Sequence, residues 1–411
     1  LTDDNPRNEN SNQIRKDIKK GIKIKKVIEI SNRSKAITEA IRNLNSGEIL
    51  LVAGKGHEKT QTIGKRKIHF SDKKIILGAI KKKNLLLSTD LKLNIIKEVS
   101  GYKQFPSSIS LKKATINSKE VKRNDIFFAI KGKKNDGNKF VKESFKRKAS
   151  VAIVNRLQID SNIRRQIKVK DTLKFLTQIS QIFRTNLKTK IIAITGSCGK
   201  TTLKELLGSS FKKICKTSIS PKSYNNKYGV PLSLLNLNQA DDYGVLEVGM
   251  DKKGEIDYLS KIIKPDISVI TNVNYAHAKN FKNIKQIALA KSEIINNTRT
   301  KGYVVLNSDD AFFSFHKKIA LKNKCIVISF GLKNKKSDIA FINIKKKGMI
   351  YKIYIKIDNQ KKCFFISNDF QNTIYNILAT LAVMKINKNV FKLDKNIFLN
   401  FKTPAGRGDI S

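Results

Sequence analysis

The 411 residues include 83 Lys or Arg against 33 Asp or Glu, which gives a formal net charge of +50 at pH 7. This length allows two to four domains with more than one core, and a hydrophobic content of 40% argues against a disordered chain. No apolar run reaches the roughly eighteen residues of a membrane-spanning helix, so no membrane insertion is expected.

The positive charge is spread along the whole chain. Lysines occur from Lys16 to Lys402 without gathering in one arm, their companions are Ile and Asn, and Trp is absent. This mixture is typical of a coding bias acting on surface positions, and it lacks the motifs of a nucleic-acid-binding protein. We therefore expect no nucleic acid as a partner, although a positive field favours an anionic substrate such as a nucleotide sugar.

The cysteines and the first residues of the chain indicate the cellular compartment in which the protein is expected. None of the four cysteines belongs to a Cys-x-x-Cys pair or has a histidine at metal-binding spacing. A reducing, cytoplasmic setting is therefore expected. The chain begins with Leu1 and no apolar signal segment follows it, which favours a fragment over a secreted precursor.

The sequence pattern divides the chain into three blocks, which we predict to be domains over residues 1–87, 88–187 and 188–411. In the first block the expected elements are a helix ending near Leu44, a strand over 48–53, a glycine-rich turn over 54–58, a helix over 72–81 and a linker over 81–84. In the second they are a strand over 125–130, a loop with Gly132, Asp136 and Gly137, a helix over 140–148 and a strand over 151–154.

The third block alternates apolar strands with helical stretches. Strands are expected over residues 191–195, 245–248, 267–273, 303–307 and 325–330. Alternation of this kind predicts an α/β fold with a mostly parallel sheet and helices on both faces. From 339 to 367 the apolar period changes to two, which predicts an antiparallel hairpin, and a helix over 372–385 follows.

Residues 195–202 read Thr-Gly-Ser-Cys-Gly-Lys-Thr-Thr and lie between the strand 191–194 and a helical segment that begins with Leu203. The glycines let the backbone curl so that its N–H groups face an anion, and the following helix adds its positive end. Lys200 can reach the β- and γ-phosphates of a nucleotide, and the Thr201 hydroxyl can hold Mg²⁺. The spacing departs from the general P-loop, since Ile194 stands where the first glycine would be.

Two further residues follow strands of the same sheet. Glu247 ends the strand 245–248, and His277 comes shortly after the strand 267–273. Side chains at the carboxyl ends of parallel strands point into the crevice where nucleotides bind. Taken alone, Glu247 is more simply an exposed acid and His277 an ordinary loop histidine, so the two gain weight only from their place beside the phosphate loop.

The motifs over residues 90–411 resemble those of the Mur ligase family, in the family's order. They are residues 195–202, 224–232, 246–250, 254–256, 271–273, 276–277 and 288–294, then Asn372 with Asn376, and 404–408; in the second block, 117–119, 125–127, 131–132 and 136–138 also match. A set of ordered motifs is far more specific than any one of them.

The resemblance implies an ATP-dependent, peptide-bond-forming ligase of peptidoglycan precursor synthesis. In the branch of the family that these motifs match, the γ-phosphate of ATP passes to the terminal carboxylate of UDP-N-acetylmuramoyl-tripeptide. The amine of D-alanyl-D-alanine then attacks the acyl phosphate, and phosphate leaves. Positioning and neutralisation of phosphate charge supply most of the catalysis.

The resemblance also implies roles for individual residues. ATP would be held by Gly196, Ser197, Cys198, Gly199, Lys200, Thr201, Thr202, Asn372 and Arg407. Mg²⁺ would be held by Thr201, Glu247, His277 and Lys291, with Lys200, His277 and a carboxylated Lys291 as the catalytic set. The UDP-muramyl-peptide would meet Ser118, Asn225 and Asn226. Without its Ala-x-Ala-Lys-x-Glu-Ile context, Lys291 is one more surface lysine.

The first block resembles a different branch of the family, in a Rossmann-like C-terminal domain. Residues 4–7 (Asp-Asn-Pro-Arg) and 53–58 (Ala-Gly-Lys-Gly-His-Glu) look like the two motifs that read meso-diaminopimelate there. By this resemblance Asn5, Arg7, Gly54 and Glu58 contact the substrate, Arg7 through a carboxylate and Glu58 through an ammonium group. The chain is thus expected to be a fusion of two ligases cut at both ends.

Departures from the family pattern limit this expectation. The family's third domain, with its Asp-Asp-x-Tyr-Asn-x-Asn-Pro stretch, has no counterpart before Ser411, and Gln371 stands where a His is common. The chain alone is therefore expected to be weakly active or inactive. Three alternatives stay open: ligation of meso-diaminopimelate, folate-polyglutamate synthesis, and a nucleotide- or nucleic-acid-binding module without ligase chemistry.

Overall fold

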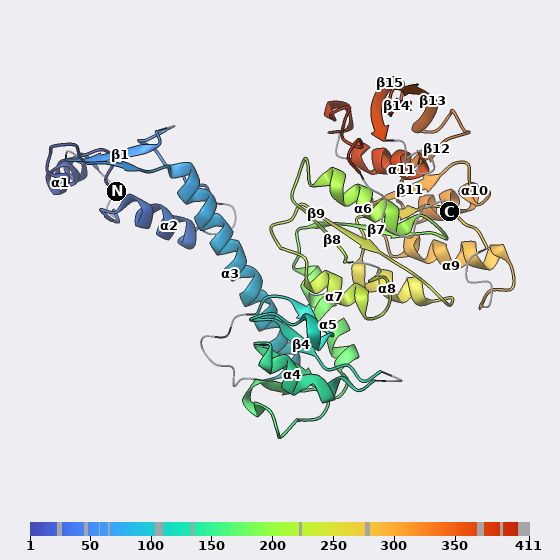
Figure 1. Ribbon diagram of the computed structural model, residues 1–411, viewed down its shortest axis with the longest axis horizontal. Coiled ribbons are helices and arrows are strands. Elements are labelled where there is room, and N and C mark those ends of the chain that lie inside the picture. The colour runs from blue at the N-terminus through green and yellow to red at the C-terminus, as the bar shows by residue number, and fades with distance from the viewer. Residues whose placement is uncertain are drawn as a thin grey trace. The chain divides into compact units, whose positions relative to one another are not determined.

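The computed structural model describes residues 1–22, 27–44, 48–56, 58–64, 66–102, 109, 111–132, 135–221, 224–275, 280–367, 374–386 and 389–401. The chain forms two compact units, Leu1–Asp90 and Leu91–Ser411 (Figure 1). The second unit contains two separate sheets. The expected domain limits at 87/88 and 187/188 stay predictions. None of the described helices is long and apolar enough to cross a membrane.

The first unit is built from helices and a small hairpin. Its elements are α1 (Ser11–Gly21), α2 (Arg33–Asn43), the antiparallel strands β1 (Thr60–Ile63) and β2 (Arg66–His69), and the first part of α3 (Asp72–Ser100). The predicted helix ending near Leu44 is confirmed as α2. A buried ion pair joins two of these helices, since Arg33 Nε and Nη2 donate to the Asp72 carboxylate at 2.9 and 2.6 Å.

The strand predicted over residues 48–53 is not formed. Its side chains alternate as in a strand, with Leu50 and Val52 packed against the small core under α2, and Ile49 and Leu51 94% and 85% exposed. No described segment pairs with it, and an extended segment without a hydrogen-bonded neighbour is not part of a sheet. The apolar pattern identified which side chains pack inward, but it could not show that no described segment pairs with them.

The linker predicted over residues 81–84 is also wrong, because α3 runs through it without interruption. No Gly or Pro occurs between Ala79 and Ser100 to stop a helix. Lys83 lies on α3, and its Nζ donates to the Ile41 carbonyl at 2.7 Å and to the Leu44 carbonyl at the end of α2. A run of lysines indicated a solvated segment, but here one of them holds two helices together.

A four-stranded parallel sheet opens the second unit. Its order is β3 (Ala114–Thr115), β4 (Ile126–Phe128), β5 (Val151–Val154) and β6 (Gln166–Lys168). The helices α4 (Val141–Lys146) and α5 (Thr172–Thr185) accompany it. The expected strands over 125–130 and 151–154 and the helix over 140–148 are confirmed, with the first strand shorter than predicted.

The larger sheet has nine strands in the order β15-β14-β13-β12-β11-β10-β7-β9-β8. Its parallel part consists of β7 (Lys190–Thr195), β8 (Thr217–Ile219), β9 (Tyr243–Glu247), β10 (Ile267–Ile270), β11 (Tyr303–Asn307) and β12 (Ile326–Gly331), and β13 (Ile339–Lys347) pairs parallel with β12. All five predicted strands of this part are present. The edge strand β8 was not predicted, because three residues carry too little periodicity.

Helices cover both faces of this sheet, as predicted (Figure 1). Along β7, Ile191 and Ala193 pack into the core beneath α7 (Gly229–Leu235), α8 (Glu255–Ile263) and α9 (Ile284–Asn296). Ile192 and Ile194 pack into the opposite core, beneath α6 (Lys200–Phe211) and α11 (Ile374–Lys385). A strand buried on both faces is a continuous apolar run, which is why this strand was evident in the sequence.

The period-two segment forms three strands rather than a single hairpin. β13, β14 (Ile350–Ile357) and β15 (Gln360–Ser367) are antiparallel neighbours at the end of the nine-stranded sheet. Ile353, Ile355 and Ile357 face the core, while the alternate residues of β14 are half-exposed. Alternation of this kind follows from a sheet with one face buried.

The continuity of α3 predicts the effect of a proline within it. Lys82→Pro removes a helical hydrogen bond and clashes with the preceding turn, so it should destabilise this helix by about 3 kcal/mol. Hydrogen–deuterium exchange should show faster exchange of the amides on both sides of position 82, and far-UV circular dichroism should show lost helix.

Lys82→Ala is the matched control, because Lys82 is exposed and Ala is compatible with a helix. Equal exchange in the two variants would mean that residues 81–84 are an irregular linker after all.

Candidate functional site

The predicted strand–loop–helix is formed at the carboxyl edge of the large sheet. Residues 195–199 lead from β7 into α6, which begins at Lys200. The first backbone N–H groups of an α-helix have no partner within the helix and are available to an anion. Gly199 at the N-cap contributes no side-chain hydrogen bond that would occupy them.

A buried carboxylate lies directly beside this helix. Glu247 ends β9, the parallel neighbour of β7, and only 1% of it is exposed. Thr201 Oγ1 donates to Glu247 Oε2 at 2.8 Å, and Asn225 Nδ2 donates to Glu247 Oε1 at 2.8 Å. One carboxylate therefore joins the phosphate-loop helix to the segment that precedes α7.

The phosphate loop is held from the other side by the segment that leaves β10. Five hydrogen bonds of 2.6 to 3.0 Å join the two: Ser197 N to Asn272 O, Cys198 N to Asn272 Oδ1, Thr271 Oγ1 to Cys198 O, Ser197 Oγ to Asn274 O and Asn274 N to Ser197 Oγ. The loop is thus fixed in shape by protein contacts alone, which leaves its geometry ready for a ligand.

Two glycines of the loop are required by their surroundings. Gly196 has φ of +148°, and a Cβ there would lie 1.8 Å from Thr271 Oγ1. Gly199 has φ of +79°, and a Cβ there would lie 3.1 Å from Asn376 Oδ1. Only glycine fits such positions without strain. Thr271, Asn272 and Asn376 received no role from the sequence, although all three belong to the motifs quoted for the family.

The polar groups of the loop suit a phosphate. Lys200 Nζ donates to the carbonyls of Gly196 and Ser197 at 2.7 and 3.2 Å, so the ammonium group lies over the loop. Thr195 Oγ1 is buried and has no hydrogen-bond partner among the described residues. A buried hydroxyl without a partner is unfavourable unless a ligand or water completes it.

Lys291 is the most perturbed ionisable group near the site. It lies on α9, is 2% exposed, and has its pKa lowered to about 7 by burial and, secondarily, by the positive charge of Lys200. An ordinary lysine has a pKa near 10.5, so this amine is half neutral close to pH 7. A neutral amine is a nucleophile, whereas an ammonium group is not.

Oxygen ligands for a hard cation are present in part. Thr201 Oγ1 and Glu247 Oε2 are neighbours at 2.8 Å, and hydroxyl and carboxylate oxygens are the donors that Mg²⁺ prefers. Within the described part of the chain, no group of three His, Cys, Asp or Glu side chains could hold a metal. The donor set fits Mg²⁺ that keeps waters or substrate oxygens among its ligands.

Three predicted site residues, His277, Asn372 and Arg407, lie outside the described residues. Of the remaining loop residues, Ser197 and Thr202 are buried and Cys198 is exposed.

The three residues predicted to meet the UDP-muramyl-peptide all make internal hydrogen bonds. Ser118 is buried and donates to Glu143 Oε2 at 2.7 Å. Asn225 Nδ2 is committed to Glu247, and Asn226 Oδ1 accepts from the N–H groups of Tyr228 and Gly229 at 3.0 Å, at the start of α7. These contacts fix the loops that carry them.

A buried asparagine in the short 3-10 turn Gly137–Phe140 was given no role, although it belongs to the family-like motif 136–138. Asn138 is 1% exposed, and its Nδ2 donates to Asp136 Oδ1 and Asn155 Oδ1 at 2.6 and 2.7 Å. Its own Oδ1 is buried without a hydrogen-bond partner among the described residues. This oxygen is a free acceptor within the family-like motif itself.

In the first unit, the structure brings three of the four predicted residues together. Asn5 Nδ2 donates to Glu58 Oε2 at 2.8 Å, and Lys55 Nζ, fully buried, lies 2.8 Å from Asn5 Oδ1 and 3.3 Å from Glu58 Oε2. Gly54, with φ of +112°, has Asp4 Oδ2 3.2 Å from the place of a Cβ. Arg7 is exposed, and its backbone bonds to Thr62 and Gly64. Lys55, which was given no role, is the centre of this cluster.

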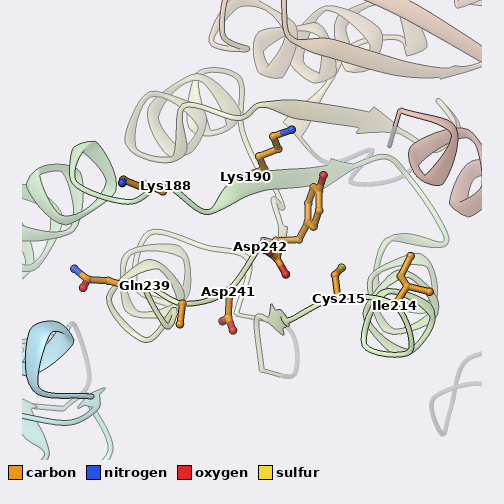
Figure 2. A pocket seen from close by; sticks show the side chains of 9 residues that line it. Lys188, Lys190, Ile214, Cys215, Gln239, Asp241 and Asp242 are labelled. Carbon is orange, nitrogen blue, oxygen red and sulfur yellow. The ribbon is translucent and has the colours of Figure 1, made fainter. Parts of the chain in front are cut away.

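A cavity of about 570 Å³ lies elsewhere on the second unit (Figure 2). It is lined by Lys188, Lys190, Ile214, Cys215, Gln239, Ala240, Asp241, Asp242 and Tyr243. Lys190 and Tyr243 are the first residues of β7 and β9, so the cavity opens at the amino edge of the sheet. The phosphate loop lies at the carboxyl edge, and the cavity is not part of that site.

Comparison with known proteins supports the resemblance. Residues 194–384 match the family model described as the Mur ligase middle domain, and residues 1–56 match the one described as the Mur ligase glutamate ligase domain. The UDP-N-acetylmuramoyl-tripeptide–D-alanyl-D-alanine ligase of Buchnera aphidicola from Acyrthosiphon pisum is 36% identical over 256 residues, which are 62% of this chain and 55% of that protein. The chain spans about half the length of the curated relatives it matches.

Solved structures agree with these matches. MurF from Acinetobacter baumannii has a TM-score of 0.66 at 28% identity, over 76% of this chain and 69% of that one. MurF from Thermotoga maritima, in complex with ADP, has a TM-score of 0.62 at 28% identity, over 72% and 67%. The predicted family and its α/β fold with a mostly parallel sheet are therefore confirmed.

The lowered pKa of Lys291 predicts how stability depends on pH. Between about 7 and 10.5 the unfolded lysine binds more protons than the folded one, so this residue makes the free energy of unfolding rise with pH. Lys291→Met removes the contribution. In carbonate-free buffer, the free energy of unfolding of the wild type minus that of the variant should increase by at most about 1.4 kcal/mol per pH unit above pH 7.

Urea unfolding followed by far-UV circular dichroism measures this difference. Lys285→Met, an exposed position on the same helix, is the matched control and should keep the wild-type slope. Parallel curves for wild type and Lys291→Met would show that Lys291 titrates as an ordinary lysine.

Proposed function

Because the chain belongs to the Mur ligase family through its middle domain, we propose that the complete protein joins D-alanyl-D-alanine to UDP-N-acetylmuramoyl-tripeptide in an ATP-dependent reaction. Relatives named for this activity and two MurF structures support the assignment. The observation that carries it is the buried Glu247 carboxylate, which bonds both to Thr201 on the phosphate-loop helix and to Asn225 on the neighbouring loop. The four cysteines are unpaired, which favours a cytoplasmic setting.

The proposed reaction has two steps. A carboxylate oxygen of the tripeptide attacks the γ-phosphorus of ATP, the bond to the β,γ-bridging oxygen breaks, and ADP leaves an acyl phosphate behind. The amine of D-alanyl-D-alanine then attacks the acyl carbon, loses a proton, and inorganic phosphate leaves with the electron pair of the C–O bond. Lys200 and the N–H groups at the start of α6 lie where they would neutralise phosphate charge in the first step.

We assign Thr201 and Glu247 as oxygen ligands of one Mg²⁺, and His277 and Lys291 as ligands of a second. A bound Mg²⁺ would withdraw charge from the phosphate oxygens. The close approach of Thr201 Oγ1 and Glu247 Oε2 supports the first site. Asn372 at the adenine and Arg407 at the phosphates belong to the same proposal and rest on the family resemblance.

Lys291 is proposed to be carboxylated. Its neutral amine would add to the carbon of CO₂ and lose a proton to solvent, which gives a carbamate with two hard oxygen ligands. Burial and the pKa of about 7 support this, because only the unprotonated amine reacts and a lysine with an ordinary pKa is almost fully protonated.

The UDP end of the substrate is proposed to lie on the four-stranded sheet. The free acceptor Oδ1 of buried Asn138 supports this, since a uracil ring offers an N–H donor. Ser118, hydrogen-bonded to Glu143, belongs to the same region, because the first turn after β3 packs against α4. Asn225 and Asn226 would act through the shape of the loop between β8 and α7.

Loss of the Lys200 ammonium group predicts loss of catalysis. Lys200→Ala in the complete gene product should abolish phosphate release from ATP in the presence of both substrates, because removing a preorganised charge of this kind costs a factor of about 100 to 1,000 or more. Lys212→Ala, an exposed lysine past the end of α6, is the control and should keep full turnover. A near-normal kcat for Lys200→Ala would contradict the assignment.

Carboxylation of Lys291 can be detected directly. After equilibration with ¹³C-bicarbonate above pH 7, the carbonyl region of a ¹³C NMR spectrum should contain a protein-bound carbamate signal that weakens as the pH falls below the Lys291 pKa of about 7. Lys291→Met should lack the signal, and Lys285→Met should retain it. A signal equally strong in all three proteins would place the carbamate on another amine.

A second candidate function concerns the first unit. The cluster of Asn5, Gly54, Lys55 and Glu58 supports recognition of meso-diaminopimelate, with Arg7 for a carboxylate and Glu58 for an ammonium group. The match of residues 1–56 to the glutamate ligase domain supports this too. In the complete gene product, incorporation of meso-diaminopimelate into UDP-N-acetylmuramoyl-dipeptide that depends on Glu58 but not on Lys200 would establish two separate ligase activities.

A further inference from the structure

The strands β13, β14 and β15 form an antiparallel extension of the nine-stranded sheet. Lysines that are separate in the sequence lie together on the face of this extension that points away from the core. Residues 339–367 contain seven lysines and a single acid, Asp358. Cross-strand pairing places Lys345 opposite Lys352 and Lys356 opposite Lys361, and residues directly opposite share a face. Lys347, Tyr354 and Phe365 lie on the same face by their register, and we call these five lysines and two aromatic residues the lysine face.

The charge of the lysine face is not balanced within the protein. In the part of the chain that the structure describes, no carboxylate forms an ion pair with any of its five lysines, and Asp358 is paired with Lys385 instead. Like charges directly opposite on neighbouring strands destabilise a sheet. An anionic partner would relieve this repulsion, and it would have to be extended in two dimensions, since the lysines occupy all three strands.

The aromatic residues distinguish between two such partners. A single-stranded nucleic acid binds by stacking its bases on exposed aromatic rings. Here Lys352 Nζ and Lys361 Nζ lie 5.1 and 4.7 Å from the centre of the Tyr354 ring, and Lys347 Nζ lies 6.0 Å from that of Phe365. The ammonium groups therefore compete with a base for stacking on these rings, and nucleic acid is disfavoured.

The turn between β13 and β14 favours a lipid surface. Met349 in this turn is 83% exposed. Lys347 and Gly348, which has φ of +60°, precede it, and the half-exposed Ile350 follows it. An apolar tip beside a group of lysines matches the boundary of a bilayer, where acyl chains lie beneath charged headgroups. A phosphate-rich polymer would not bury the methionine.

We propose that the lysine face binds the surface of a bilayer that contains anionic lipids, with Met349 entering the headgroup region. The contact is peripheral and spans nothing, in agreement with the lack of a spanning helix among the described residues. It is independent of the ligase reaction, since it uses no residue assigned to ATP or to the peptide substrates.

Sedimentation with vesicles tests the proposal on the 411-residue chain. Vesicles of phosphatidylcholine with phosphatidylglycerol should bind the protein, vesicles of phosphatidylcholine alone should not, and added salt should weaken binding. The triple variant Lys345→Gln, Lys352→Gln, Lys361→Gln should bind about a hundredfold more weakly. Met349→Ser should lose about tenfold.

A matched triple variant controls for total charge. Lys285→Gln, Lys318→Gln and Lys322→Gln remove three exposed lysines from α9 and α10 and should leave binding close to that of the unchanged chain. Unchanged thermal unfolding of both triples shows that each is folded. Equal losses in the two triples would overturn the lysine face, and so would a single-stranded oligonucleotide that binds it more tightly than the vesicles do.

Discussion

The site depends on one buried carboxylate. Glu247 accepts hydrogen bonds from Thr201 on the phosphate-loop helix and from Asn225 on the loop before α7, and it has almost no contact with solvent. An unpaired buried charge is strongly unfavourable, so these two partners are as necessary to the carboxylate as it is to them. Because β7 and β9 are parallel neighbours, their carboxyl ends bring the helix and the acid together without any long connection.

The phosphate loop is fixed by a second set of contacts that does not involve Glu247. The segment from Thr271 to Asn274 binds the loop through both backbone and side-chain groups, and α11 adds Asn376 beside Gly199. Each of these segments follows or overlies a different strand of one sheet. Rigidity in the sheet is thus transferred to a loop of five residues, and the loop does not have to be ordered when a ligand binds.

The sequence predicted the features that depend on local pattern. The parallel strands are apolar runs, and Gly196, Gly199 and Lys200 form a recognisable loop between a strand and a helix, so both were found without the structure. What escaped prediction depends on partners distant in the chain. Residues 48–53 have no neighbouring strand among the described segments, and Lys83 on α3 binds the end of α2 through its side chain. Asn272 binds Cys198 across 74 positions of the sequence. Periodicity contains no information about such pairings.

The contact between Gly196 and Thr271 has a consequence for how this site can vary. The two residues lie on separate loops, but the space that a side chain would need at one is filled by the hydroxyl group of the other. A smaller residue at Thr271 would remove the hydroxyl group but not the constraint on residue 196, since the positive φ remains and the Thr271 backbone N still lies 3.2 Å from the place of a Cβ. Glycine at residue 196 is therefore required twice, by its own backbone conformation and by a segment 75 residues away in the sequence.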